Sequence, residues 1–155
     1  MATPMEAADE RGTLLGFLGY LRTAVVRKLD GVGDVDARRR LVPSGTTLAG
    51  LVNHLAGVER YWLQRRFAGL DVDLTGFGFE LAESDTVAVV VDRYQAAVAA
   101  SDEIIAACDD LDTPFARPVG DLRLRWVLVH LIEETGRHAG HADILRELID
   151  GAVGR

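Results

Sequence analysis

At 155 residues, of which 48% are hydrophobic, the chain is long enough to bury one core, so we expect a single domain over residues 1–155. The formal net charge of −7 weighs against nonspecific binding to nucleic acid. Cys108 is the only cysteine, which excludes an intrachain disulfide and a zinc site built from paired cysteines. The acidic N-terminal segment is unlike a secretory signal, and no apolar run approaches the ~20 residues that span a bilayer. We therefore expect a cytoplasmic protein with no membrane partner.

The first two helices are predicted from apolar side chains that recur at spacings of three and four residues. The first helix runs from about Glu6 to Leu29, and Gly31 follows it as a stop signal. The second opens after a turn at residues 43–47 and runs to about Ala68, before a glycine.

Two more helices follow a loop rich in glycine and aspartate. The third is capped by Ser84 and runs to about Asp110, and its β-branched run at 89–91 has flanks that keep helical spacing. The fourth runs from about Asp121 to Ile149. This pattern predicts an all-α four-helix bundle. Connections of roughly 10 to 16 residues between the first three helices exceed those of simple bundles, so at least one should cross the bundle or shape a pocket mouth.

The apolar face of the last helix is interrupted by a carboxylate and two imidazoles. Its heptad-spaced residues are Leu124, Val127, Leu131, Glu134, His138, His141, Leu145 and Leu148. Because apolar residues occupy both ends of this series, we expect the same face to point inward throughout. Burying such polar groups unpaired costs roughly 2 to 7 kcal/mol each, and a bound cation is the simplest compensation.

Spacing selects the candidate ligands. Glu134 and His138 are four residues apart and share one helix face, with His141 three residues later and His130 four residues before Glu134. His54 lies at the edge of the apolar face of the second helix, so a bundle can bring it opposite this pair. Two neutral imidazoles and one carboxylate leave a zinc ion net positive, with a fourth position for water or a thiolate. A buried Glu134–His138 ion pair without metal is the competing interpretation.

Other candidates carry less weight. Tyr61 could reach the same pocket from the second helix, although an aromatic residue there is more often part of the core or rim. Glu59 and Arg60 are assigned to a solvated or ion-paired helix flank. Cys108 is assigned as a small buried hydrophobe, because no paired base or helix cap supports its reactivity.

Two stretches of the chain resemble the DinB-like superfamily of four-helix bundles. They are LVPSGTTLAGLVNHLAGVERYWLQRRFAG at 41–69 and LRLRWVLVHLIEETGRHAGHADILRELIDG at 122–151. They look most like an uncharacterised actinobacterial branch related to mycothiol-dependent maleylpyruvate isomerase. The resemblance implies a metal held by His54, Glu134 and His138. It also implies that His141 supports the site first and serves as an alternate ligand second.

The resemblance implies a metal-dependent enzyme that activates a low-molecular-weight thiol, mycothiol, for S-transfer or isomerisation of a small electrophile. Coordination would favour the thiolate at neutral pH, and His141 or His130 would orient a ligand or shuttle a proton. Tyr61 is the candidate residue for binding the thiol cosubstrate. Zinc is the expected metal, and nickel, manganese and iron are compatible with the same ligands.

Two alternative functions stay open at this stage. A noncatalytic helical or small-ligand-binding protein would use a structural metal, closed by His141 as the fourth ligand. An iron oxygenase rests only on the set of two histidines and one carboxylate. The acceptor substrate, the native metal and the oligomeric state are not determined by the sequence, and a homodimer is compatible with it.

Overall fold

A computed structural model of the protein describes residues 9–154, and within that range it contains helices and no strands. Its elements are α1 (Glu10–Arg27), α2 (Asp34–Ala37), α3 (Leu48–Glu59), the π-helix η1 (Arg60–Phe67), α4 (Val87–Ala106) and α5 (Leu124–Asp150). The all-α prediction is confirmed. The predicted first residue of the first helix, Glu6, lies outside the described residues. None of the described helices is both long and apolar enough to cross a membrane.

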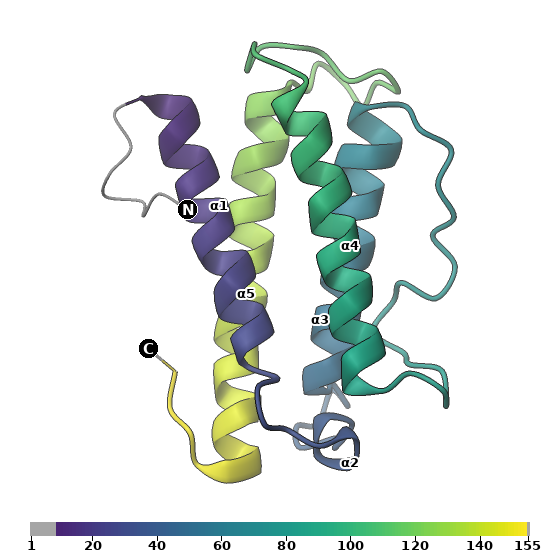
Figure 1. The fold of residues 1–155 in the computed structure, drawn as a ribbon, viewed down its shortest axis with the longest axis vertical. Helices are drawn as coiled ribbons and strands as arrows, with labels where there is room; N and C mark the ends of the chain where they lie inside the picture. The colour runs from purple at the N-terminus through teal and green to yellow at the C-terminus, as the bar shows by residue number, and fades with distance from the viewer. Residues whose placement is uncertain (1–8, 155) are drawn as a thin grey trace.

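The long helices form two neighbouring pairs. α1 packs along α5, and α3 packs along α4, while α3 also contacts α5 and joins the pairs. Figure 1 shows the four long helices running roughly along one axis, with the short α2 below them in the connection between α1 and α3. This arrangement places α3 and α5, which carry the candidate metal ligands, against each other.

Side-chain caps account for where three of the helices begin. Asp9, Thr47 and Thr86 each accept a hydrogen bond from the backbone N–H three residues later. The predicted cap Ser84 is therefore wrong, and the third long helix begins two residues after it would have. α5 ends at Gly151, which takes a left-handed conformation with φ of 77° that favours glycine.

The second predicted helix is divided into α3 and a π-helical segment. The widened turns of η1 begin directly after Glu59, whose side chain is buried against Arg22 of α1. A π-helical stretch shifts the direction in which later side chains point, and such segments are frequent at functional sites. The prediction of an ion-paired flank was correct for the pairing of Glu59 and wrong for its location, because only 1% of this residue is exposed.

The core consists of two hydrophobic clusters, and the polar part of α5 lies between them. The buried apolar residues of α5 before Glu134, ending at Leu131, pack into one cluster, and those from Ala139 onward pack into the other. Glu134 and His138 therefore occupy the junction of the clusters, which explains how a buried face can hold a carboxylate and an imidazole.

Two residues of the predicted inward face of α5 lie outside the core: His141 is exposed, and Leu148 is 51% exposed. A straight α-helix drifts by about 20° per heptad relative to a seven-residue repeat. The row that begins at Val127 therefore rotates towards solvent by its third and fourth members. The row that begins at Leu124 stays buried through Leu145.

The connection between η1 and α4 folds back along α3. The carbonyl groups of Phe77 and Phe79 lie so close to Gly57 and Gly50 that a Cβ atom on either glycine would overlap them. Figure 1 shows this segment descending beside α3 as an extended loop. The expectation of a long connection that shapes the site is met by this loop.

Candidate metal centre

His54 on α3 and Glu134 and His138 on α5 converge on one point. Nε2 of His54 and Nε2 of His138 each lie 3.2 Å from Oε1 of Glu134. One donor atom from each residue can be chosen so that all three lie within 4.8 Å of one another. Side chains from two helices that are 80 residues apart in sequence thus form one cluster at the junction of the two cores.

The donor set and its spacing fit a divalent cation. Ligand atoms at roughly 2.0 to 2.2 Å from a tetrahedral ion are roughly 3.3 to 3.6 Å from each other. The two nitrogen–oxygen separations of 3.2 Å are close to this spacing and longer than the usual N–H···O hydrogen bond. The cluster could therefore hold a metal ion with little movement of its side chains.

The protonation states of Glu134 and His138 also suit a cation. Burial acts to raise the pKa of Glu134, but its hydrogen bonds with His54 and His138 and the nearby positive charge of Arg137 act against burial, and the net effect lowers this pKa. Burial lowers the pKa of His138, and the nearby carboxylate offsets this only in part. A carboxylate and a neutral imidazole are the forms that bind metal.

Arg137 and Phe79 hold the cluster from two sides. Arg137 lies 3.1 Å from Oε2 of Glu134, which leaves Oε1 to face the histidines. The ring of Phe79 stacks on His54 with centroids 4.1 Å apart and planes inclined by 13°. The same ring approaches His138 edge-on at 5.8 Å, so it restricts both imidazoles.

Asn53, which helical spacing did not single out, anchors the loop that carries Phe79. Its side chain is fully buried, and Nδ2 donates to the carbonyl oxygens of Gly76 and Gly78 at 2.8 Å. Its Oδ1 accepts from Arg93. The available signal was an amide inside an otherwise apolar helix face, directly before His54.

Replacing Asn53 with alanine should loosen this loop. We expect a loss of about 1 to 3 kcal/mol in the free energy of unfolding, because buried partners of the amide lose their hydrogen bonds. Hydrogen exchange of the amides between residues 76 and 80 should become faster. Gln64→Ala is the matched control, since it removes a buried amide that donates to Ala97 instead. Equal exchange in both variants would contradict the anchoring role.

A comparison with protein families shows to which family the chain belongs. A family-wide sequence profile described as Mycothiol-S-transferase matches residues 13–151, which include all three members of the cluster. The chain belongs to the mycothiol S-transferase family. A search of curated proteins finds no match. The predicted membership in the DinB-like superfamily is thereby confirmed.

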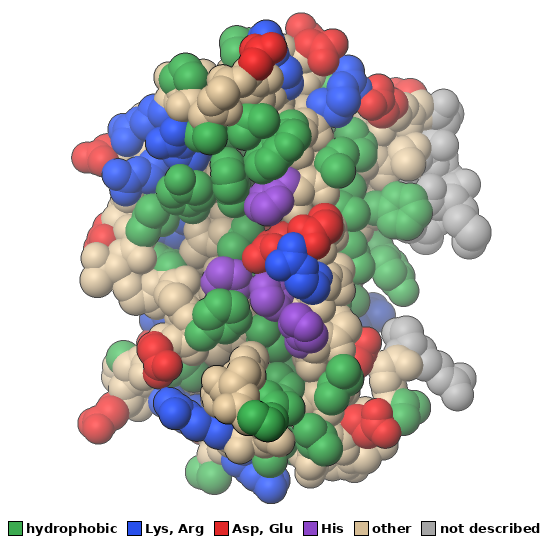
Figure 2. All heavy atoms as spheres, turned by 180° about the vertical axis from the view of Figure 1, so that it is seen from behind, with side chains coloured by type: hydrophobic (Ala, Val, Ile, Leu, Met, Phe, Trp, Pro, Cys, Tyr) green, Lys and Arg blue, Asp and Glu red, His purple; other side chains and the backbone are tan. Residues whose placement is uncertain are grey.

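Beside the cluster, this mycothiol S-transferase family member has a further imidazole. Nδ1 of His141 lies 3.4 Å from Nδ1 of His138, while the side chain itself is exposed. His141 is thus adjacent to the cluster without joining it, since its nitrogens are not among the converging donor atoms. Figure 2 shows histidine side chains gathered on one face of the molecule, next to acidic and basic ones.

His130 and Tyr61 lie on the opposite side of the cluster. Both line a cavity of about 500 Å³ whose wall also includes His54 and Glu134. The ring of His130 stacks on Trp126, with centroids 4.9 Å apart, and meets Trp62 edge-on. The structure therefore brings every predicted site residue of this family member to the cluster or to a cavity that adjoins it.

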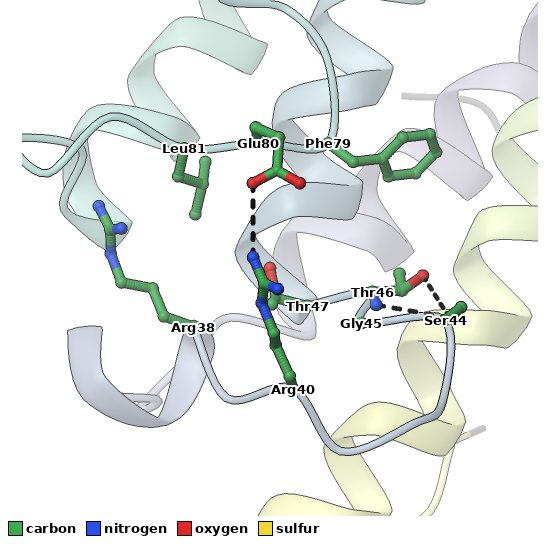
Figure 3. A pocket seen from close by; sticks show the side chains of 9 residues that line it. All are labelled: Arg38, Arg40, Ser44, Gly45, Thr46, Thr47, Phe79, Glu80 and Leu81. Atoms are coloured by element: carbon green, nitrogen blue, oxygen red, sulfur yellow. Dashed lines mark hydrogen bonds and ion pairs between the residues drawn. The ribbon is translucent and has the colours of Figure 1, made fainter.

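A second cavity lies on the far side of Phe79. It has a volume of about 260 Å³, and Figure 3 shows its lining, which includes arginine, serine and threonine side chains of residues 38–47. Arg40 lies 3.6 Å from Glu80 across its mouth, and the hydroxyl groups of Ser44 and Thr46 are 2.8 Å apart. Phe79, stacked on His54, forms part of the wall.

Proposed function

We propose that the protein is a metal-dependent enzyme that joins mycothiol, through its thiol sulfur, to a small electrophile. His54, Glu134 and His138 would hold a divalent ion, for which zinc is our candidate. The observation that carries the proposal is the convergence of these three donors in a chain whose family is described as mycothiol S-transferase.

The residues supply the following chemistry. A bound divalent ion favours the thiolate form of a thiol at neutral pH. Glu134 stays ionised and His138 neutral, so neither has to lose a proton for the site to form. In the transfer, the thiol sulfur forms a bond to the electrophilic carbon, the leaving group departs with its electron pair, and the thiol proton passes to His141 or His130.

The main alternative is a noncatalytic protein with a structural metal. A closed site of this kind would need His141 as the fourth ligand. The position of His141 supports the open arrangement, because its Nδ1 lies 3.4 Å from Nδ1 of His138 and its nitrogens are not among the converging donor atoms. Iron oxygenase chemistry rests on the ligand types alone, whereas the family description supports thiol chemistry.

The proposal is tested by measuring the metal content and the turnover of the wild-type protein and of the His141→Ala variant. Protein purified without a metal-affinity tag should contain about one divalent ion per chain and should conjugate mycothiol with an electrophile. Chelation should abolish the activity, and readdition of zinc should restore it. His141→Ala should keep its metal and melting temperature but lose activity about tenfold or more, because proton transfer or thiol orientation is impaired.

The same variant separates the two functions. If His141→Ala loses both metal and thermal stability, the metal is structural, because its binding energy then contributes directly to folding. Wild-type protein that binds metal but shows no mycothiol-dependent turnover would also overturn the proposed activity.

A further inference from the structure

We propose that the loop at residues 74–81 divides the site into two subsites, which hold different parts of the reaction. An aromatic subsite binds an apolar, planar electrophile, and a hydroxyl-lined subsite binds the sugar portion of the thiol. This inference rests on the proposed function and adds to it the class of the electrophile and the orientation of both substrates.

The aromatic subsite is the cavity of about 500 Å³. Tyr61 and Trp62 of η1 form one wall, and Leu74 and Phe77 of the loop form another. His54 and Glu134 also line it, so a molecule in the cavity touches the metal-binding cluster. Flat aromatic walls favour a planar apolar ligand, which can stack against them without leaving polar groups unpaired.

Two neighbouring aromatic residues of η1 reach the cavity. Tyr61 and Trp62 are neighbours in sequence, yet both line it, and their rings meet edge-on with centroids 5.0 Å apart. Tyr61 is 36% exposed and can contact a ligand without disturbing the core. η1 therefore places both rings on one wall of the cavity, and Tyr61 is the ring of this wall that a ligand can reach.

The hydroxyl-lined subsite lies on the other side of the loop. Phe79, Glu80 and Leu81 face it, whereas Leu74, Phe77 and Gly78 face the aromatic cavity. Figure 3 shows Arg40 and Glu80 pointing toward each other across this pocket, near the hydroxyl groups of residues 44–47. Hydroxyl, guanidinium and carboxylate groups can exchange hydrogen bonds with a polyol such as the glucosamine–inositol part of mycothiol.

A neighbouring cavity lies between this pocket and His141, which is adjacent to the cluster. Its volume is about 250 Å³, and it shares Ser44 and Thr46 with the hydroxyl-lined pocket while reaching His141. His141 in turn contacts His138. A thiol with its sugars among the hydroxyl groups thus has a path for its cysteinyl arm toward the cluster, opposite to the aromatic cavity.

The first test measures binding without chemistry. The chain has two tryptophans. Trp62 lines the aromatic cavity, and the ring centroid of Trp126 lies 5.1 Å from that of Trp62. Meta-dinitrobenzene, an unreactive planar probe, should therefore quench the intrinsic fluorescence saturably. Tyr61→Ala should weaken its binding roughly two- to tenfold, the range of one lost aromatic contact. Leu74→Asp, which places a charge on the wall that the loop forms, should weaken binding of the probe as well.

Tyr20→Ala is the matched control, because Tyr20 is an exposed tyrosine on α1 outside the cavity lining. It should leave quenching unchanged. Quenching that does not saturate, or that is the same in all three variants and the wild type, would overturn the aromatic subsite. This result would not depend on any enzymatic activity.

The second test measures conjugation of mycothiol with chlorodinitrobenzene. The thiol sulfur bonds to the chlorine-bearing carbon, chloride leaves with the bonding pair, and the thiol proton is released. The cavity lining assigns Tyr61 to the electrophile, whereas the sequence suggested that it binds the thiol. Tyr61→Ala should therefore raise KM for this electrophile roughly two- to tenfold and leave KM for mycothiol unchanged. Thr46→Val, which replaces a hydroxyl with a methyl group, should raise KM for mycothiol by a similar factor and leave KM for the electrophile unchanged.

Iodoacetamide, a small electrophile with no aromatic ring, distinguishes failure of the two-subsite proposal from failure of the proposed function. If both electrophiles are turned over but Tyr61→Ala does not selectively raise KM for chlorodinitrobenzene and Thr46→Val does not selectively raise KM for mycothiol, the two subsites are overturned. The proposed function would then still stand. Absence of mycothiol-dependent turnover with both electrophiles would overturn the proposed function, and the subsites with it.

Discussion

Changing Glu134 to glutamine should lower the affinity for a divalent metal at least about 100-fold while the helical bundle stays folded. Loss of groups that only orient ligands typically costs 10- to 100-fold, and Glu134 is the single anionic donor of the cluster. Glutamine keeps the approximate shape of the side chain, so packing at the junction of the two cores should survive. Competition against a chromophoric chelator measures the affinity, and circular dichroism measures the fold.

Glu133→Gln is the matched control for this prediction. Glu133 is the adjacent residue, is exposed, and pairs with Arg137 on the surface of the helix. It should therefore have little effect on metal affinity. Equal affinities in the wild type and Glu134→Gln would remove Glu134 from the ligand set, whereas unfolding of Glu134→Gln would favour a structural metal or an essential ion pair.

The largest effect on stability is expected from breaking the buried ion pair on the other side of α3. Nε and Nη2 of Arg22 each donate to a carboxylate oxygen of Glu59 at 2.7 Å, and both residues are nearly inaccessible to solvent. Arg22→Met would leave the Glu59 carboxylate buried without a partner. We expect a loss of about 3 to 5 kcal/mol in the free energy of unfolding, measured with urea in the presence of a chelator.

The double variant Arg22→Met, Glu59→Leu should recover most of this loss, because it removes both charges and fills the site with apolar atoms. Arg27→Met on the same helix is the control, since Arg27 is exposed, and it should change stability by less than about 0.5 kcal/mol. A loss in Arg22→Met no greater than in this control would contradict a role for the pair in stability.

The sequence alone determined the helical class and the identity of the residues that could bind metal. Periodic apolar side chains specify a helix and its buried face locally, because neighbours three and four residues apart share that face. The same rule placed Glu134 and His138 together on α5 and His54 on the inner edge of α3. Family resemblance then supplied the thiol chemistry, which spacing alone does not contain.

Tertiary structure decided which of these residues meet and what surrounds them. The drift of a real helix from a seven-residue repeat carried His141 and Leu148 to the surface, which a heptad pattern does not reveal. Phe79 stacks on His54 from a loop that Asn53 binds by hydrogen bonds and that two glycines of α3 allow to lie against the helix. The buried partner of Glu59 comes from α1, 37 residues away in sequence. Contacts of this kind depend on how distant segments pack, so local spacing could not predict them.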